Sequence, residues 1–361
     1  MSITAERVNE ILKTVVDPNT GKDLVSSRAA RNVKVSGADV SVDIELGYPA
    51  ASQIDGIRSL VVNALKAAGA GNVSANVTMK IVAHTVQRGL KVMPNVKNIV
   101  AVSSGKGGVG KSTVAVNLAL ALAAEGARVG MLDADIYGPS QPTMLGIEGK
   151  PESVDGKTLE PLENYGIQAS SIGFLVDADQ PMVWRGPMVT QALQQLLAQT
   201  NWKDLDYLIV DMPPGTGDIQ LTLAQQVPVT GAVIVTTPQD IALLDAIKGL
   251  KMFEKVGVPI LGIVENMAVH VCSKCGHAEH VFGAGGAERM SKEYGVEVLG
   301  SLPLDIRIRE QTDSGRPTVV AEPDSDIART YKAIARKVAI RIAEKAKDMS
   351  LKIPTIKVSN T

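Results

Sequence analysis

The stretch Gly105-Lys106-Gly107-Gly108-Val109-Gly110-Lys111-Ser112 fits the phosphate-binding pattern G-x-x-x-x-G-K-[ST]. Its glycines allow consecutive backbone N–H groups to converge on phosphate oxygens, while Lys111 can reach the β- and γ-phosphates and the Ser112 hydroxyl can bind Mg²⁺. An apolar run at residues 98–102 predicts a buried strand before the loop, and residues 113–119 predict the start of a helix after it. Such a helix points its positive end at the bound anion. The stretch therefore predicts a nucleotide site.

Apolar strands and helical segments alternate along the chain after this loop. The expected strands are residues 99–103, 128–133, 207–211, 232–236 and 260–266. This alternation predicts a mostly parallel sheet with helices on both faces and phosphate chemistry at the carboxyl ends of the strands. Hydrophobic residues make up 45% of the chain but aromatic residues only 3%, so packing depends on aliphatic side chains, as in a buried parallel sheet. The expected fold class is an α/β P-loop NTPase.

A separate small α/β domain is expected at residues 1–90. Its hydrophobic spacing predicts two helices and several strands, over residues 2–16, 54–68, 32–46 and 73–81. We expect a linker at residues 91–96 and the phosphate-binding domain at residues 97–361.

Charge and targeting features limit the classes of partner. Lys and Arg number 37 against 38 Asp and Glu, a net charge of −1, which gives no reason to expect nucleic acid or an acidic membrane as a partner. Residues 1–7 lack the apolar core of a signal peptide, and no apolar run approaches the ~18 residues that span a bilayer. An amphipathic helix is expected at residues 326–347; its apolar face lacks Trp and Phe, so packing against the domain is favoured over a membrane anchor. A cytoplasmic protein is predicted.

Acidic residues end two of the expected strands. Asp133 ends one strand and Asp135 comes two residues later, and Asp211 ends another strand. In P-loop NTPases, carboxylates at these places hold Mg²⁺ or orient the attacking water. The alternative is that the aspartates only cap a turn or the next helix. The glycines of residues 212–218 suit a loop that moves when a γ-phosphate is bound, although a rigid turn has the same composition.

Lys106 is a second lysine inside the phosphate loop. It cannot easily bend back onto phosphates that the backbone of its own loop already surrounds. Across a two-fold axis it could reach a partner's nucleotide and act like an arginine finger. A solvated lysine is the alternative, and geometry alone does not separate the two.

The only two cysteines form the pair Cys272-x-x-Cys275. In a reducing compartment this spacing points to metal or redox chemistry before a structural disulfide. Two of His270, His277 and His280 could complete a tetrahedral zinc site. Two chains could instead pool their cysteines around a shared [4Fe–4S] cluster. Redox-active or inert thiols are the third possibility.

Several long motifs in order resemble those of the Mrp/ApbC family of iron–sulfur carrier ATPases. The wider class, which includes septum-site and partitioning ATPases and the nitrogenase iron protein, has the loop K-G-G-x-G-K-[ST], here residues 106–112. The family motifs are Asp-Ala-Asp-Ile-Tyr-Gly-Pro-Ser at 133–140, Trp-Arg-Gly-Pro-Met at 184–188, Asp-Met-Pro-Pro-Gly-Thr-Gly-Asp at 211–218, and Glu-Asn-Met at 265–267 before Cys272. Residues 1–90, with Asp-Pro-Asn-Thr-Gly-Lys-Asp-Leu at 17–24, resemble a small domain of other iron–sulfur assembly factors.

The resemblance implies an ATPase that carries a labile [4Fe–4S] cluster. A homodimer would hold nucleotide at its interface and bridge the cluster through Cys272 and Cys275, taking it from scaffold proteins and passing it to apo iron–sulfur proteins. By this resemblance, Lys111, Ser112 and Thr113 would bind phosphate and Mg²⁺, and Lys106 would act in trans. Asp135 would position water, and Asp133 and Asp211 would support Mg²⁺. Asn266 would contact adenine. No role follows for Arg185. The contrasting hypothesis is a nucleotide-switched partitioning or positioning ATPase that acts on membrane or DNA and has a zinc-binding loop.

Overall fold

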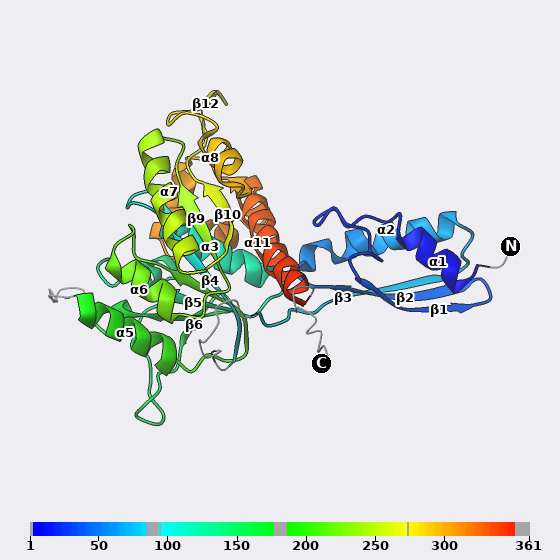
Figure 1. Ribbon diagram of the computed structural model, residues 1–361, viewed down its shortest axis with the longest axis horizontal. Coiled ribbons are helices and arrows are strands. Elements are labelled where there is room, and N and C mark those ends of the chain that lie inside the picture. Colours follow the sequence, from blue (N-terminus) through cyan, green and yellow to red (C-terminus); the bar gives the residue numbers. More distant parts are fainter. Residues whose placement is uncertain (1–2, 85–92, 94, 177–185, 273, 351–361) are drawn as a thin grey trace, which may run out of the picture. The chain divides into compact units, whose positions relative to one another are not determined.

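Figure 1 shows the computed structural model of the chain, which describes residues 3–84, 93, 95–176, 186–272 and 274–350. The chain divides into two compact units. One comprises Met1–Val82 with Ala339–Thr361, and the other Ala83–Val338.

The small unit is a three-stranded sheet with two helices. Its elements are α1 (Ala5–Leu12), β1 (Ala30–Ser36), β2 (Asp39–Leu46), the short 3-10 helix η1 (Ala51–Gln53), α2 (Ile54–Ala67) and β3 (Val73–Met79). The order is β1-β2-β3, with β1 antiparallel and β3 parallel to β2. Val40, Val42, Ile44 and Leu46 alternate along β2 on its buried side. These side chains and the apolar stripes of both helices form a core, as the period-2 and period-3.6 patterns predict.

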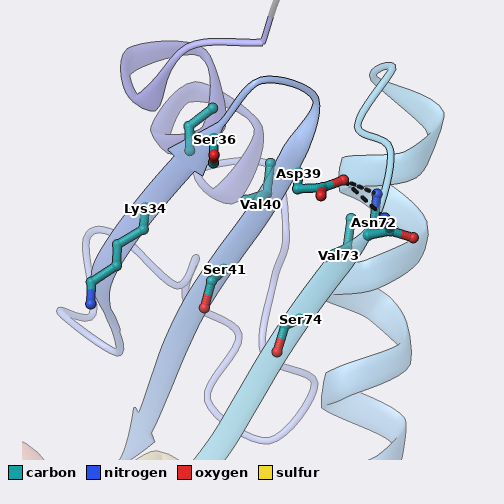
Figure 2. A pocket seen from close by; sticks show the side chains of 9 residues that line it. Lys34, Ser36, Asp39, Val40, Ser41, Asn72, Val73 and Ser74 are labelled. Carbon is teal, nitrogen blue, oxygen red and sulfur yellow. Dashed lines mark hydrogen bonds between the residues drawn. The ribbon is translucent and has the colours of Figure 1, made fainter.

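A shallow pocket lies at the end of this sheet where β2 begins. Figure 2 shows Lys34, Ser41 and Ser74 on three adjacent strands, and Asp39 accepting two hydrogen bonds from Asn72, from its backbone N–H at 2.9 Å and its side-chain amide at 3.0 Å. Neither cysteine nor histidine lines the pocket. It therefore lacks the thiolate and imidazole ligands that the cysteine motif indicates.

The larger unit is built on an eight-stranded sheet in the order β13-β10-β9-β4-β8-β5-β7-β6. Neighbouring strands are parallel except β6 and β7. The strands are β4 (Val96–Ser103), β5 (Val129–Asp133), β6 (Leu162–Asn164), β7 (Ile167–Ser171), β8 (Leu205–Asp211), β9 (Gly231–Thr236), β10 (Ile260–Glu265) and β13 (Val298–Ser301). A separate hairpin joins β11 (His270–Val271) to β12 (Ala278–Glu279).

Helices cover both faces of this sheet. The helices of this unit are α3 (Lys111–Ala124), α4 (Gln141–Met144), η2 (Ile172–Phe174), α5 (Gly186–Gln199), α6 (Asp218–Gln226), α7 (Asp240–Lys255), α8 (Gly286–Tyr294), α9 (Ile306–Asp313), α10 (Thr318–Ala321) and, up to Val338, α11 (Asp326–Ser350). One buried cluster joins α5, α6, α7 and α8 to alternate residues of the central strands, such as Leu208 and Val210 of β8. Helix α3 has no residue in that cluster and contacts β4, β5 and β8. The predicted fold class, a mostly parallel sheet flanked by helices with a small N-terminal α/β domain, is confirmed.

The division between the units differs from the expected boundaries. The larger unit begins at Ala83 because His84 is already hydrogen-bonded to the sheet: its backbone N–H donates to the carbonyl of Lys97 at 3.3 Å. Strand β4 begins at Val96, the last residue of the expected linker; residues 91, 92 and 94 of that linker lie outside the described residues. From Ala339 onward, α11 belongs to the small unit, where Glu344 pairs with Lys22 at 2.5 Å.

The apolar face of α11 is packed, as its composition predicts. Ile327, Tyr331, Ile334, Val338 and Ile342 are all buried. None of the helices in the described part of the chain combines the length and the apolar character that crossing a membrane requires.

Candidate nucleotide and cysteine site

The predicted phosphate loop connects β4 to α3, the expected strand–loop–helix setting. Gly108 and Gly110 both have φ of +80°, in the left-handed region that favours glycine. Gly105 has a different reason to be glycine. A Cβ there would lie 2.0 Å from the backbone carbonyl of Asp245 in α7, so only glycine permits this close approach between the loop and the helix.

Lys111 and Asp211 form a buried ion pair at the carboxyl ends of β4 and β8. The side chain of Lys111 is 6% exposed and that of Asp211 fully buried. The Lys111 ammonium also donates to the Ser112 hydroxyl at 3.1 Å. Because a buried charge is tolerated only with a partner, a nucleotide phosphate would compete with Asp211 for this ammonium.

Gln141 is a member of this cluster that the sequence did not single out. Its side-chain amide donates to Asp211 at 2.8 Å and to the backbone carbonyl of Ser112 at 3.2 Å. Its own amide oxygen, Oε1, is buried without a hydrogen-bond partner. A neutral glutamine eight residues after the end of β5 gives no local signal; its place depends on how the chain returns after Asp133.

The oxygen atoms around Lys111 suit a magnesium ion. The Ser112 hydroxyl, the Asp211 carboxylate and the unpartnered Oε1 of Gln141 belong to one contiguous cluster. Mg²⁺ prefers such oxygen ligands and retains several waters. The described residues therefore fit the ion that normally accompanies a nucleotide in P-loop proteins.

Asp133 and Asp135 occupy different environments although only one residue separates them. Asp133 is fully buried and accepts from the N–H groups of Asp135, Ser140 and Gln141 at 3.0–3.2 Å and from the Ser171 hydroxyl at 3.0 Å. Burial, assisted by the charge of Asp211, raises the pKa of Asp133 to about 7. These contacts make Asp133 the residue that holds the loop from 135 to 141 in shape. Any support it gives Mg²⁺ would act through that loop.

Asp135 is half-buried beside Lys111 and Asp211. The pKa of Asp135 is raised above its ordinary value. Burial is the largest cause and the charge of Asp211 adds to it, whereas the ammonium of Lys111 acts in the opposite direction. Carboxylates that are partly accessible and close to a lysine ammonium can orient a water, and this role for Asp135 stays a prediction.

Asn266 follows the last residue of β10 and touches the phosphate loop itself. Its side-chain amide donates to the carbonyl of Val109 at 2.9 Å, and a Cβ on Gly110 would lie 2.2 Å from that amide nitrogen. Contact with adenine stays a prediction. The Lys106 side chain is partly exposed, and its action in trans likewise stays a prediction.

The cysteine pair lies in the turn between β11 and β12. The Cys272 N–H donates to the His277 carbonyl at 2.9 Å, and the Gly276 N–H donates to the Cys272 carbonyl at 2.8 Å. Both thiols are free; Cys272 is partly exposed and Cys275 exposed. The backbone N–H groups of Lys274 and Cys275, and the Cys275 thiol, lower the pKa of Cys272. The turn therefore favours the thiolate form that binds metals.

Two of the histidines near this turn lie next to backbone carbonyls. His270 Nδ1 lies 3.0 Å from the Leu304 carbonyl, and His280 Nδ1 lies 2.7 Å from the Ala268 carbonyl. Within the described ranges, no three or more His, Cys, Asp or Glu side chains are grouped so that they could hold a metal ion. A four-ligand zinc site within one chain thus has no support among these residues. Trp184 and Arg185, from the motif at 184–188, lie outside the described residues.

Two protein families match the chain. Residues 95–339 match the family described as NUBPL iron-transfer P-loop NTPase, and residues 5–79 match a family described as iron-sulfur cluster assembly protein. The iron-sulfur cluster carrier protein of Haemophilus influenzae is 50% identical over 346 residues, which are 94% of this chain and 94% of that protein.

Solved structures with the same fold include nucleotide-binding proteins. A nucleotide-binding protein from Archaeoglobus fulgidus, in complex with ADP, is 39% identical with a TM-score of 0.57, and the match covers 66% of this chain and 93% of that one. The cell division ATPase MinD of Pyrococcus furiosus is 23% identical with a TM-score of 0.51, covering 67% and 98%. The likeness to MinD is one of fold.

Proposed function

Because the chain belongs to the family described as NUBPL iron-transfer P-loop NTPases, we propose that it is an ATP-hydrolysing carrier of iron–sulfur clusters. It would bind a labile [4Fe–4S] cluster at a homodimer interface, accept it from scaffold proteins and transfer it to apo iron–sulfur proteins in the cytoplasm. The observation that carries this proposal is that one unit contains both a phosphate loop and a turn with two free cysteines.

The residues around the phosphate loop supply binding and positioning. Lys111 exchanges Asp211 for the β- and γ-phosphates, and the N–H groups at the start of α3, including those of Ser112 and Thr113, face the same anion. Ser112 and Asp211 would hold Mg²⁺, which neutralises phosphate charge during transfer. Asp135 orients the water that attacks the γ-phosphorus, so that ADP leaves and inorganic phosphate forms.

The cluster is cargo, and its stoichiometry favours two chains. A [4Fe–4S] cube has four irons that each need an external ligand, whereas one chain contains only two cysteines. Cys272 and Cys275 of two subunits would complete the set around a two-fold axis. Partial exposure of Cys272 and exposure of Cys275 to solvent suit a cluster that must be released.

Exposed apolar side chains next to the phosphate loop support a homodimer. Ile241 is 72% exposed and Leu244 is 61% exposed; they lie three residues apart on one face of α7. The next residue, Asp245, is the one whose backbone approaches Gly105. A second copy that covers this strip would also come within reach of Lys106, as action in trans requires.

We expect Leu244→Glu to weaken the ATP-bound dimer by about tenfold or more, because a charge would replace a buried apolar contact. Hydrolysis per subunit should fall in parallel, since Lys106 then lacks a partner's nucleotide. Sedimentation velocity with Mg-ATP measures the first effect and phosphate release the second. Leu60→Glu, at a leucine of α2 that is 45% exposed, is the matched control. An unchanged dimer in the Leu244 variant would contradict this interface.

Anaerobic reconstitution with iron and sulfide tests the carrier function. A brown protein that activates an apo iron–sulfur enzyme supports it, and transfer should fail without added cluster. Colourless protein that instead pellets with liposomes or DNA when ATP is present would overturn the proposal in favour of a partitioning or positioning switch.

A further inference from the structure

Two consecutive residues, Glu265 and Asn266, contact the phosphate loop and the start of α8 from one end of the cysteine-bearing segment. The segment follows β10, is held at its start by the Ala268 N–H, which donates to the Leu302 carbonyl at 2.9 Å, and by the Val269 carbonyl, which accepts from the Leu304 N–H at 2.8 Å, and ends at Gly286, where α8 begins. Asn266 bonds to the phosphate loop through the carbonyl of Val109. Glu265 bonds to the returning end, because its carboxylate accepts from the N–H groups of Ala287, at 2.8 Å, and Gly286.

Glu265 caps a helix that cannot cap itself. The residue before α8 is Gly285, at φ +69°, which has no side chain to accept a hydrogen bond. Glu265 is only 3% exposed, and burial raises its pKa while the two N–H donors lower it. A buried carboxyl from another element thus satisfies donors that the first turn of α8 leaves open.

Both ends of this arrangement are closely packed. A Cβ on Gly286 would lie 2.8 Å from the carbonyl of Pro238, in the segment before α7, and 2.9 Å from the Leu243 side chain. At the other end, the Asn266 amide already fills the space beside Gly110. Because closely packed parts move together, a shift of the phosphate loop would move Asn266. The start of α8 is held by Glu265.

We propose that Glu265 and Asn266 form a link within one subunit that transmits nucleotide-dependent movement of the phosphate loop to the cysteine turn, with Glu265 as the positioning residue at its returning end. The proposal rests on the proposed function, because it assigns how nucleotide controls the cluster ligands. It differs from coupling by rotation between subunits alone, since the link is complete in a single chain.

The accessibility of the cysteines reports on this link without a cluster. In apo protein, the alkylation rates of Cys272 and Cys275 by iodoacetamide are measured by mass spectrometry with and without Mg-ATP. For the wild-type chain we expect Mg-ATP to change these rates by about fivefold or more, the lower range of coupling between two sites. In Glu265→Ala the change should vanish while the affinity for ATP stays at the wild-type value.

Three further variants separate a positioning role of Glu265 from a general loss of folding. Glu265→Gln keeps an oxygen that accepts from Ala287 and should retain most of the response. Glu265→Asp withdraws the carboxylate by one methylene and should lose it, which keeps the test decisive should the alanine variant not fold. Glu288→Gln removes an exposed acid in the first turn of α8 and should behave as wild type.

Two outcomes would overturn the link: wild-type alkylation that does not respond to Mg-ATP, or an undiminished response in both Glu265→Ala and Glu265→Asp. Failure of the proposed function is distinguishable. A chain that binds no cluster but whose cysteines respond to ATP through Glu265 refutes the carrier and supports the link. Cluster transfer that keeps the wild-type efficiency in the Glu265 variants supports the carrier and refutes the link.

Discussion

Lys111→Ala should weaken ATP binding by about 100-fold, because it removes charge-assisted hydrogen bonds to phosphate. The variant also leaves the buried carboxylate of Asp211 without its cation, and that negative charge would then face the nucleotide. Calorimetric titration with Mg-ATP measures the affinity, and circular dichroism establishes that the variant is folded.

Asp135→Asn is the matched comparison within the same site. Its binding affinity should stay near the wild-type value while single-turnover hydrolysis slows by about 100-fold or more, the usual contribution of a carboxylate that positions or deprotonates water. The amide keeps the size of the half-buried side chain. Normal hydrolysis by this variant would refute the role of Asp135, and ATP affinity that survives in Lys111→Ala would refute that of Lys111.

Replacing either cysteine by alanine should reduce bound iron from about four per dimer to nearly none. Each substitution removes two of the four thiolates at once, because the dimer repeats it in both subunits. Cluster transfer should be lost with the iron. ATP hydrolysis should largely persist, since Cys272 and Cys275 lie in the β11–β12 turn and not in the phosphate loop.

Metal analysis after anaerobic reconstitution makes this test decisive. Iron and acid-labile sulfide are counted per dimer, alongside phosphate release for the same samples. One zinc per monomer that disappears on His277→Ala or His280→Ala would contradict the shared cluster. A dimer that holds its iron after Cys272→Ala would do the same.

Short-range patterns were sufficient to predict the fold class and the position of the phosphate loop. Residues 105–112 predicted the phosphate loop, and the apolar runs predicted β4, β5, β8, β9 and β10. These signals are local: a turn, a helix start or a buried strand depends on neighbours a few residues away. Strands β6, β7 and β13 escaped prediction because they are short or polar, as in Ile-Gln-Ala-Ser-Ser of β7, and gain their place only from pairing with the sheet.

The sequence by itself therefore determined the fold class, the phosphate loop and the paired cysteines, while the tertiary structure decided which of these side chains meet. Lys111 pairs with Asp211 one hundred residues away, Gln141 joins them, and Glu265 holds the start of α8 beyond the cysteine turn. Asp133 and Asp135 look equivalent in sequence, yet one is enclosed by four donors and the other remains partly accessible. Such differences depend on which strand ends converge and what covers them, and burial and long-range contacts of that kind arise only when the whole sheet has assembled.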